Sequence, residues 1–285
     1  MTSLTEHWKP DQHLSLRVTN MHRFTRCRRQ WILDHLGYRG QNSEAALRGT
    51  LVHVGLEAWY SGAGNTTGAV LAEAVEIAGP VDGWEKWQSD ALRYATVMLT
   101  GYMERLEQGI DIGRKVIAVE REVTHYFPDL NTTLKGHVDL IWETEFGLTV
   151  TDHKTTTRTY ETIPDNQQLM AYSYLLYLED GEWPDAAEHN VLRTVLRTRA
   201  SKSEPYYRSQ VLINEFQRQS SEMYIIETIK DMRHALDRGD RAMYPSVAET
   251  GHCGWCSFKD VCPQLSDGSD YQHTLDTQYI REQGK

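Results

Sequence analysis

The chain has 285 residues, 40% of them hydrophobic and 25% charged, which is typical of a soluble globular protein with one large core or two smaller ones. It contains no apolar run of about eighteen residues and no signal-peptide pattern, so we expect a cytoplasmic protein without a membrane partner. The formal net charge of −10 argues against strong non-specific binding to duplex DNA, because affinity for phosphates depends on lysines and arginines.

The first third of the chain is predicted to be helical. Thr19 or Asn20 is expected to cap a first helix that ends at Gly37 or Gly40. The apolar stripe of this helix contains Met21, Phe24, Cys27 and Trp31. We therefore expect Cys27 to lie on a helix.

Three more helices are predicted before residue 115. One covers residues 44–60, carries His53 beside its apolar face and is ended by Gly62 and Gly64. A short helix near residues 66–78 follows it. The apolar stripe of the last and longest helix contains Trp84, Trp87, Ala91, Met98 and Tyr102.

The pattern then changes to strands. Residues 116–127, 132–144 and 147–157 are predicted to form an antiparallel meander, because each alternates apolar and polar residues and short turn sequences separate them. Asp139 falls on the polar face of the second strand, although aspartate disfavours strands. After a helix at 166–180, strands at 189–196 and 206–213 are expected, and then a helix that begins with an Asn214–Gln217 capping box and ends at Gly239. This mixture indicates an α/β fold.

The segment DHKTTT contains the strongest chemical signal. Asp152 and Lys154 are two positions apart on a strand, so the carboxylate and the ammonium project from the same face. A hydrolytic metal site uses both groups, since carboxylates hold a divalent ion while a lysine orients water and offsets charge on a phosphate. An ordinary surface ion pair has the same spacing, so the motif alone is weak.

The four cysteines suggest one metal centre. Three of them lie close together near the C-terminus, and the fourth is near the N-terminus: Cys253, Cys256, Cys262 and Cys27. A reducing cytoplasm favours metal ligation over disulfides. An iron–sulfur cluster and a structural zinc ion both take four thiolates, and the spacing alone leaves the two open.

Basic residues are concentrated in two segments in spite of the acidic total. The first contains Arg17, Arg23, Arg26, Arg28 and Arg29, and the second contains Arg193, Arg197, Arg199, Lys202 and Arg208. Each segment is either a DNA contact or a solvated charged face, and composition does not decide between them.

These motifs together resemble the PD-(D/E)xK nuclease superfamily, in particular its RecB-like branch with a four-cysteine iron–sulfur cluster. That branch includes CRISPR-associated single-strand exonucleases and AddB-type nuclease domains. The resemblance extends over about residues 19–263 and rests on six motifs in the family's order: RCRRQW, RGTLVHVGLEAW, GHVDLIWE, TDHKTT, QLMAY and CGWCSFKDVCP. It implies a restriction-endonuclease-like core, with a central mixed sheet flanked by helices, a helical N-terminal region and a cluster that joins the two ends of the chain.

The resemblance also implies a role for each matching residue. His53, Asp139 and Asp152 would ligate Mg²⁺ or Mn²⁺ together with the backbone carbonyl of His153. Lys154 would help to orient or activate the attacking water. Gln168 and Tyr172 match an element that contacts the DNA backbone. Cys27, Cys253, Cys256 and Cys262 would bind a [4Fe–4S] cluster of structural role, with zinc as the alternative. Asp152 stands where many relatives have glutamate.

The function implied is a metal-dependent DNA exonuclease that digests single-stranded DNA from an end in recombination, repair or phage DNA processing. The alternative is a DNA-end-binding accessory subunit of a recombination or CRISPR-adaptation complex, and in a virus the location would be the host cytoplasm.

We expect an N-terminal arm (1–18), a helical region (19–115), a nuclease core (116–240), a cysteine-rich segment (241–266) and a polar tail (267–285), which is either a docking peptide or disordered.

Several other polar residues are left out of the expected site. Glu120 and Glu122 lie on one strand face, where solvated glutamates are the common outcome. His125 and His252 are treated in the same way. His137 shares the polar face with Asp139, so it is the histidine we expect to support the metal ligands from behind.

Overall fold

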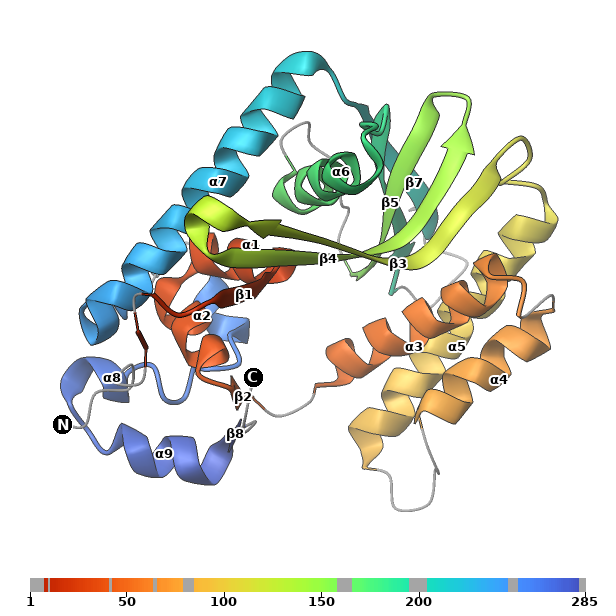
Figure 1. Ribbon diagram of the computed structural model, residues 1–285. Helices are drawn as coiled ribbons and strands as arrows, with labels where there is room; N and C mark the ends of the chain where they lie inside the picture. The colour runs from red at the N-terminus through yellow and green to blue at the C-terminus, as the bar shows by residue number, and fades with distance from the viewer. Residues whose placement is uncertain are drawn as a thin grey trace. The chain divides into compact units, whose positions relative to one another are not determined.

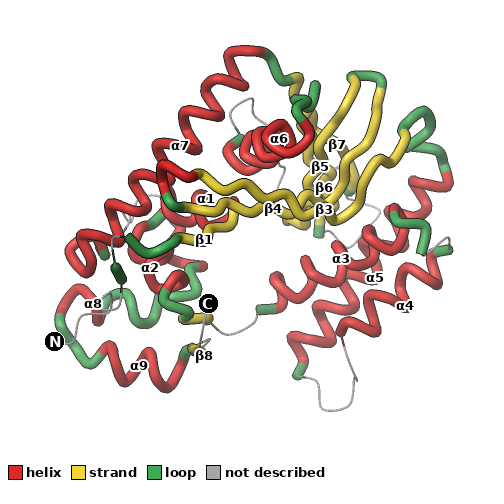
Figure 2. Tube along the Cα trace, in the orientation of Figure 1, coloured by secondary structure: helices red, strands yellow, loops and turns green. Residues whose placement is uncertain are grey.

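The computed structural model describes residues 8–9, 11–40, 43–63, 66–78, 85–157, 166–194, 204–245 and 251–281. The chain divides into two compact units. Unit 1 contains residues 1–41, 124–135 and 222–285, and unit 2 contains residues 42–123 and 136–221. The ribbon (Figure 1) and the tube (Figure 2) show helices interspersed with strands, which is the α/β class that the sequence predicts. Within the described ranges, no helix has both the length and the apolar character to cross a membrane.

Unit 2 is built on a mixed β-sheet. Strand β4 (Thr132–Thr144) pairs antiparallel with β5 (Gly147–Thr156), and β3 (Lys115–Phe127) also pairs with β4. Strand β5 pairs parallel with β6 (Ala186–Arg193), which pairs antiparallel with β7 (Tyr206–Leu212). The expected meander is therefore confirmed as β3, β4 and β5.

Helices cover both faces of this sheet. Helices α3 (Glu44–Tyr60), α4 (Thr67–Ala78) and α5 (Lys86–Glu107) pack together, and α3 contacts β5 while α5 contacts β6. Their shared core includes Leu51, Leu56, Leu99 and Met103. Helix α6 (Gln167–Asp180) contacts β5 and β6 as well. Successive side chains of β5 point to opposite faces, so α6 meets Asp152 while α3 approaches His153 from the other face.

Unit 1 brings together three stretches that are far apart in the sequence. Strand β1 (Leu14–Arg17) pairs parallel with the start of β4, and α1 (Val18–Arg26) contacts β1 and α2 (Arg28–His35). Strand β2 (Tyr38–Arg39) pairs antiparallel with β8 (Ile280–Arg281). The remaining elements are η1 (Pro128–Leu130), α7 (Glu215–Arg238), η2 (Gly239–Ala242), η4 (His252–Trp255), α8 (Gln264–Asp267) and α9 (Tyr271–Gln278), of which α7 begins in unit 2.

The prediction that Cys27 lies on a helix is wrong. Cys27 has φ −160° and ψ 112°, an extended backbone that separates α1 from α2. The apolar stripe continues across this break, since Met21, Phe24 and Trp31 are all buried, so periodicity alone cannot detect it. Gly37 follows α2 with φ 87°, which agrees with the expected stop.

The other predicted helices are confirmed where the structure describes them. Ser43 caps α3, and the reciprocal bonds of Asn214 and Gln217 form the expected capping box before α7. Gly64, Trp84 and residues 195–203 lie outside the described residues. Parts of the expected arm and tail are ordered elements, because β1 completes a strand pair and α9 buries Leu275.

Candidate active site

The candidate site forms where β4 and β5 stop pairing. The last pair of their antiparallel register is Leu140 opposite Thr151. Asp139 and Asp152 are the next residues on the two strands, beyond that pair. The backbone N–H of His153 donates instead to Asp139 Oδ2 at 2.6 Å. The carboxylate thus takes the place of a strand carbonyl, and both aspartates are buried beside the parted strands.

His53 reaches the same point from α3. Its Nε2 lies 3.0 Å from the carbonyl oxygen of His153, and its Nδ1 lies 3.5 Å from Asp139 Oδ2. A neutral imidazole donates from only one nitrogen, whereas both nitrogens here face oxygen atoms. Burial disfavours the charged ring, but the hydrogen bond and the charge of Asp139 outweigh it and raise the pKa of His53 to about 9.

Glu120 joins His53 and Asp139, although the sequence places it among solvated residues. One ligand atom from each of these three residues lies within 4.8 Å of the other two. Burial and the neighbouring charge of Asp139 raise the pKa of Glu120 to about 7. Imidazole nitrogen and carboxylate oxygen suit a divalent cation such as Mn²⁺, so this group fits the metal expected from the motifs. Glu122 is exposed, as expected.

Asp152 lies outside that group and is held by a second set of side chains. Its Oδ2 lies 2.5 Å from Lys154 Nζ, and its Oδ1 accepts a hydrogen bond from Gln168 Nε2 at 2.9 Å. Gln168 Oε1 accepts from Lys154 Nζ, and Gln168 Nε2 also donates to Tyr172 Oη. The structure therefore connects the four residues Asp152, Lys154, Gln168 and Tyr172 directly. Burial raises the pKa of Asp152, while the charge of Lys154 opposes the rise.

Gly136 provides the space for Tyr172. A Cβ atom on Gly136 would lie 2.9 Å from Cδ1 of Tyr172 and 2.9 Å from Cγ2 of Val123. A glycine is thus required on β4 for the tyrosine ring to pack over the strand, which in turn positions Gln168.

The side chain of His153 is fixed on the opposite face of the sheet, by residues that the motifs do not indicate. Asn190 Nδ2 lies 3.1 Å from His153 Nδ1 and donates to Tyr102 Oη at 2.8 Å. The Tyr60 ring stacks on the His153 ring with centroids 5.9 Å apart. Burial lowers the pKa of His153 to about 3, so the ring is neutral. These contacts keep the His153 backbone in place between His53 and Asp139.

One arginine of each basic segment is engaged in structural contacts. Arg208 forms ion pairs with Asp111 and Glu188, and its guanidinium lies 4.7 Å from the centre of the Trp142 ring. Arg29 in unit 1 is 6% exposed and donates to the carbonyl of Met243. The sequence could not show these partners, because they come from distant segments. Arg197, Arg199 and Lys202 lie outside the described residues.

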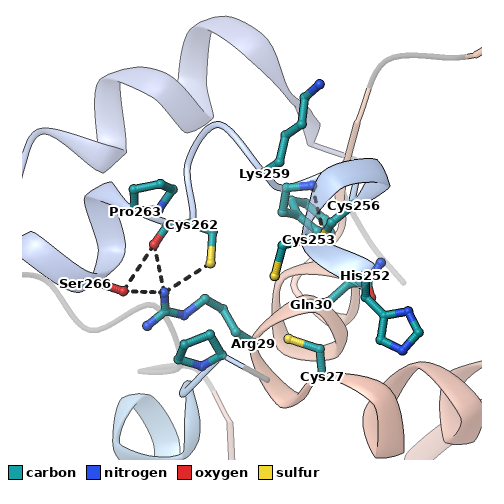
Figure 3. A pocket seen from close by; sticks show the side chains of 12 residues that line it. Cys27, Arg29, Gln30, His252, Cys253, Cys256, Lys259, Cys262, Pro263 and Ser266 are labelled. Carbon is teal, nitrogen blue, oxygen red and sulfur yellow. Dashed lines mark hydrogen bonds between the residues drawn. The ribbon is translucent and has the colours of Figure 1, made fainter. Parts of the chain in front are cut away.

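All four cysteines line one pocket of unit 1, with a volume of about 240 Å³. Cys27 enters it from the break between α1 and α2, and the other three come from the segment after η2 (Figure 3). Arg29 Nη1 donates to the Cys262 sulfur at 3.2 Å and to the Cys262 carbonyl at 2.7 Å. The two distant parts of the sequence therefore meet at this pocket.

The cysteine sulfurs are spread around the pocket. Of the described residues, no three cysteines bring their sulfur atoms within 4.8 Å of one another. A tetrahedral zinc ion with Zn–S bonds of about 2.3 Å would hold its sulfurs about 3.8 Å apart. The observed spread is wider than that.

One protein-family model matches most of the chain. Residues 15–263 match the family model of the PD-(D/E)XK nuclease superfamily. A search of curated proteins finds no match. The crystal structure of a candidate exonuclease from Eubacterium rectale has a TM-score of 0.48 and 11% identity, over 81% of this chain and 86% of that one. The crystal structure of SSO0001 has a TM-score of 0.38 and 14% identity, over 91% and 89% of the two chains. The family match includes every residue of the candidate site and all four cysteines.

Proposed function

Because the chain belongs to the PD-(D/E)XK nuclease superfamily, whose members are metal-dependent hydrolases acting on DNA, we propose that it is an exonuclease that digests single-stranded DNA from an end. The observation that carries this proposal is the convergence of His53 and Asp139 on the backbone of His153, beside the Asp152–Lys154 pair. This arrangement combines a cation site with a nearby ammonium group.

Each residue has a distinct task in the proposed reaction. His53, Asp139, Asp152 and the carbonyl of His153 would hold Mg²⁺ or Mn²⁺, which when bound polarises the scissile phosphate and lowers the pKa of water. Lys154 Nζ orients the attacking water and offsets the negative charge that develops on the phosphate oxygens. Gln168 holds Lys154 and Asp152 in position through hydrogen bonds to its side-chain amide. Together with Tyr172, to which it also donates, Gln168 contacts the DNA backbone.

The preference for single strands is supported by charge. The chain is acidic overall, and both Arg29 and Arg208 are engaged inside the protein, so less positive surface is available for a duplex. Single strands need fewer phosphate contacts because their bases also stack on aromatic side chains, and the chain has eight tryptophans and fifteen tyrosines.

The cysteine pocket is proposed to hold a structural [4Fe–4S] cluster. Four thiols around one pocket match the ligand set, and the wide spread of the sulfurs suits a body larger than a single zinc ion. Brown protein with broad visible absorption and about four iron atoms per chain after anaerobic purification is the expected result. Colourless protein with one zinc ion per chain would instead support the alternative.

The nuclease proposal is tested with purified protein, Mn²⁺ and end-labelled single strands blocked at the 5′ or the 3′ terminus. We expect stepwise shortening from one end, and loss of the product in Lys154→Met. Lys115→Met is the matched control, since Lys115 is an exposed lysine on β3 of the same unit. If the wild-type protein binds DNA ends but yields no product, the chain is instead an accessory subunit of a recombination or CRISPR-adaptation complex.

A further inference from the structure

We propose that Glu120 is a direct ligand of the divalent cation, next to His53 and Asp139. This inference rests on the proposed function, because it concerns the same cation. It adds a residue from β3 to a set that the motifs draw only from α3, β4 and β5. The site would then be formed by four separate elements of unit 2.

The first argument is distance. The ligand atoms of His53, Glu120 and Asp139 lie within 4.8 Å of one another. In an octahedral site with bonds of about 2.1 Å, adjacent ligands are about 3.0 Å apart and opposite ligands about 4.2 Å apart. The three groups are therefore near the spacing that one shared ion requires, and modest side-chain movements would complete it. Asp152, which the proposed function also assigns to the cation, is not among these three closely spaced residues, because its two oxygens face Lys154 and Gln168.

The second argument is the backbone of Glu120. Its φ is +47°, in the left-handed region, although the residue lies inside β3. A non-glycine residue in this region costs about 1 kcal/mol or more, and such residues are concentrated at functional sites. Glu120 and Asn131 are the two non-glycine residues with positive φ among those that the structure describes, and Asn131 is at a turn, where asparagine tolerates it.

The third argument is the support for the carboxylate. His137 Nε2 lies 2.8 Å from Glu120 Oε2, so one oxygen is anchored by a histidine that is itself half exposed. The anchored carboxylate lies close to Asp139, and two neighbouring carboxylates repel each other unless a cation separates them. Carboxylates that bind metals are commonly held by a further hydrogen bond, which fixes their orientation, and His137 is placed to provide one for Glu120.

The test compares Glu120→Gln with Glu122→Gln. Both variants remove one negative charge from β3, but Glu122 is exposed. Titration of the metal-free proteins with Mn²⁺ should show at least a tenfold weaker affinity for Glu120→Gln and a change within twofold for Glu122→Gln. A crystal structure of the wild-type protein with Mn²⁺, located by anomalous scattering, should show a Glu120 oxygen bonded to the ion at about 2.2 Å.

The outcomes separate this inference from the proposed function. If the wild-type protein binds Mn²⁺ and cleaves DNA while the two variants bind Mn²⁺ equally well, Glu120 is not a ligand and the nuclease proposal stands. A Mn²⁺ ion bonded to Asp139 with Glu120 more than about 3 Å away would also refute the inference, even if Glu120→Gln did not fold. Absence of both Mn²⁺ binding and cleavage in the wild-type protein would overturn both.

Discussion

Asp139 accepts the backbone N–H of His153 at 2.6 Å, at the position where β4 and β5 part. The carboxylate therefore has two tasks, one in the fold and one in the proposed cation site. Two substitutions separate these tasks, because an asparagine side chain retains the acceptor oxygen and an alanine side chain does not.

We expect Asp139→Asn to lose cleavage at least a hundredfold and to be less stable than the wild-type protein at neutral pH, because it removes the charge that raises the pKa of His53, although it keeps an acceptor for the His153 N–H. Asp139→Ala should be less stable than Asp139→Asn by about 1–3 kcal/mol, since it leaves a buried N–H without an acceptor. Urea unfolding and a nuclease assay measure both effects. Equal stability of the two variants would show that the bond to His153 does not hold the strands apart.

The strained backbone at Glu120 predicts a reversal of the usual effect of glycine. Glu120→Gly should be more stable than Glu120→Ala by about 1 kcal/mol, because glycine adopts a φ of +47° without steric cost. At Glu122, which is not among the positive-φ residues, the glycine variant should be the less stable of the pair by about 0.5–1 kcal/mol. If chemical unfolding showed the alanine variant to be the more stable one at both positions, the left-handed backbone at Glu120 would be contradicted.

The close packing at Gly136 predicts a coupled loss of stability and activity. Gly136→Ala should cost about 1–3 kcal/mol, since the new methyl group would lie 2.9 Å from the Tyr172 ring and displace it. The shift should also disturb Gln168 and reduce cleavage, with the larger effect on KM if Tyr172 contacts DNA. Gly68→Ala is the control, because the nearest heavy atom to its Cβ would be 3.9 Å away, and we expect it to be neutral or slightly stabilising.

His189 predicts sensitivity to acid. Burial lowers the pKa of His189 from 6.5 to about 3. Below pH 6.5 the histidine therefore becomes protonated in the unfolded chain, while it stays neutral in the folded protein. The stability that this group contributes is complete above pH 6.5 and is lost as the pH falls towards 3, by at most about 1.4 kcal/mol per pH unit.

His189→Gln should therefore flatten the decline of the free energy of unfolding between pH 6.5 and pH 4. The exposed His273 serves as the control, because its replacement by glutamine should leave the slope unchanged. Urea unfolding at several pH values gives both slopes. An unchanged slope in His189→Gln would mean that the buried ring is not kept neutral.

The sequence predicts much of unit 2 because its signals are local. The meander, the helix from Gln167 and the capping box at Asn214 depend on neighbouring residues, and all three are present. The contact of Asp152 with Lys154 follows from their two-residue spacing on a strand.

The remaining features depend on geometry that a pattern of residue types does not contain. Glu120 turns towards His53 through a left-handed backbone, whereas simple alternation pairs it with the exposed Glu122. Arg208 looks like a DNA contact until Asp111 and Glu188 are seen beside it. Cys27 interrupts a helix without interrupting its apolar stripe.

The discontinuity of unit 1 sets an order of events during synthesis. Residues 1–41 can complete their contacts only when residues 222–285 have left the ribosome, whereas the residues of unit 2 all lie between positions 42 and 221. Contacts between segments so distant in sequence form slowly, and domains generally fold as units during translation. Cys27 is therefore synthesised long before Cys253, Cys256 and Cys262, and the pocket that the four cysteines line can assemble only after the last of them has left the ribosome.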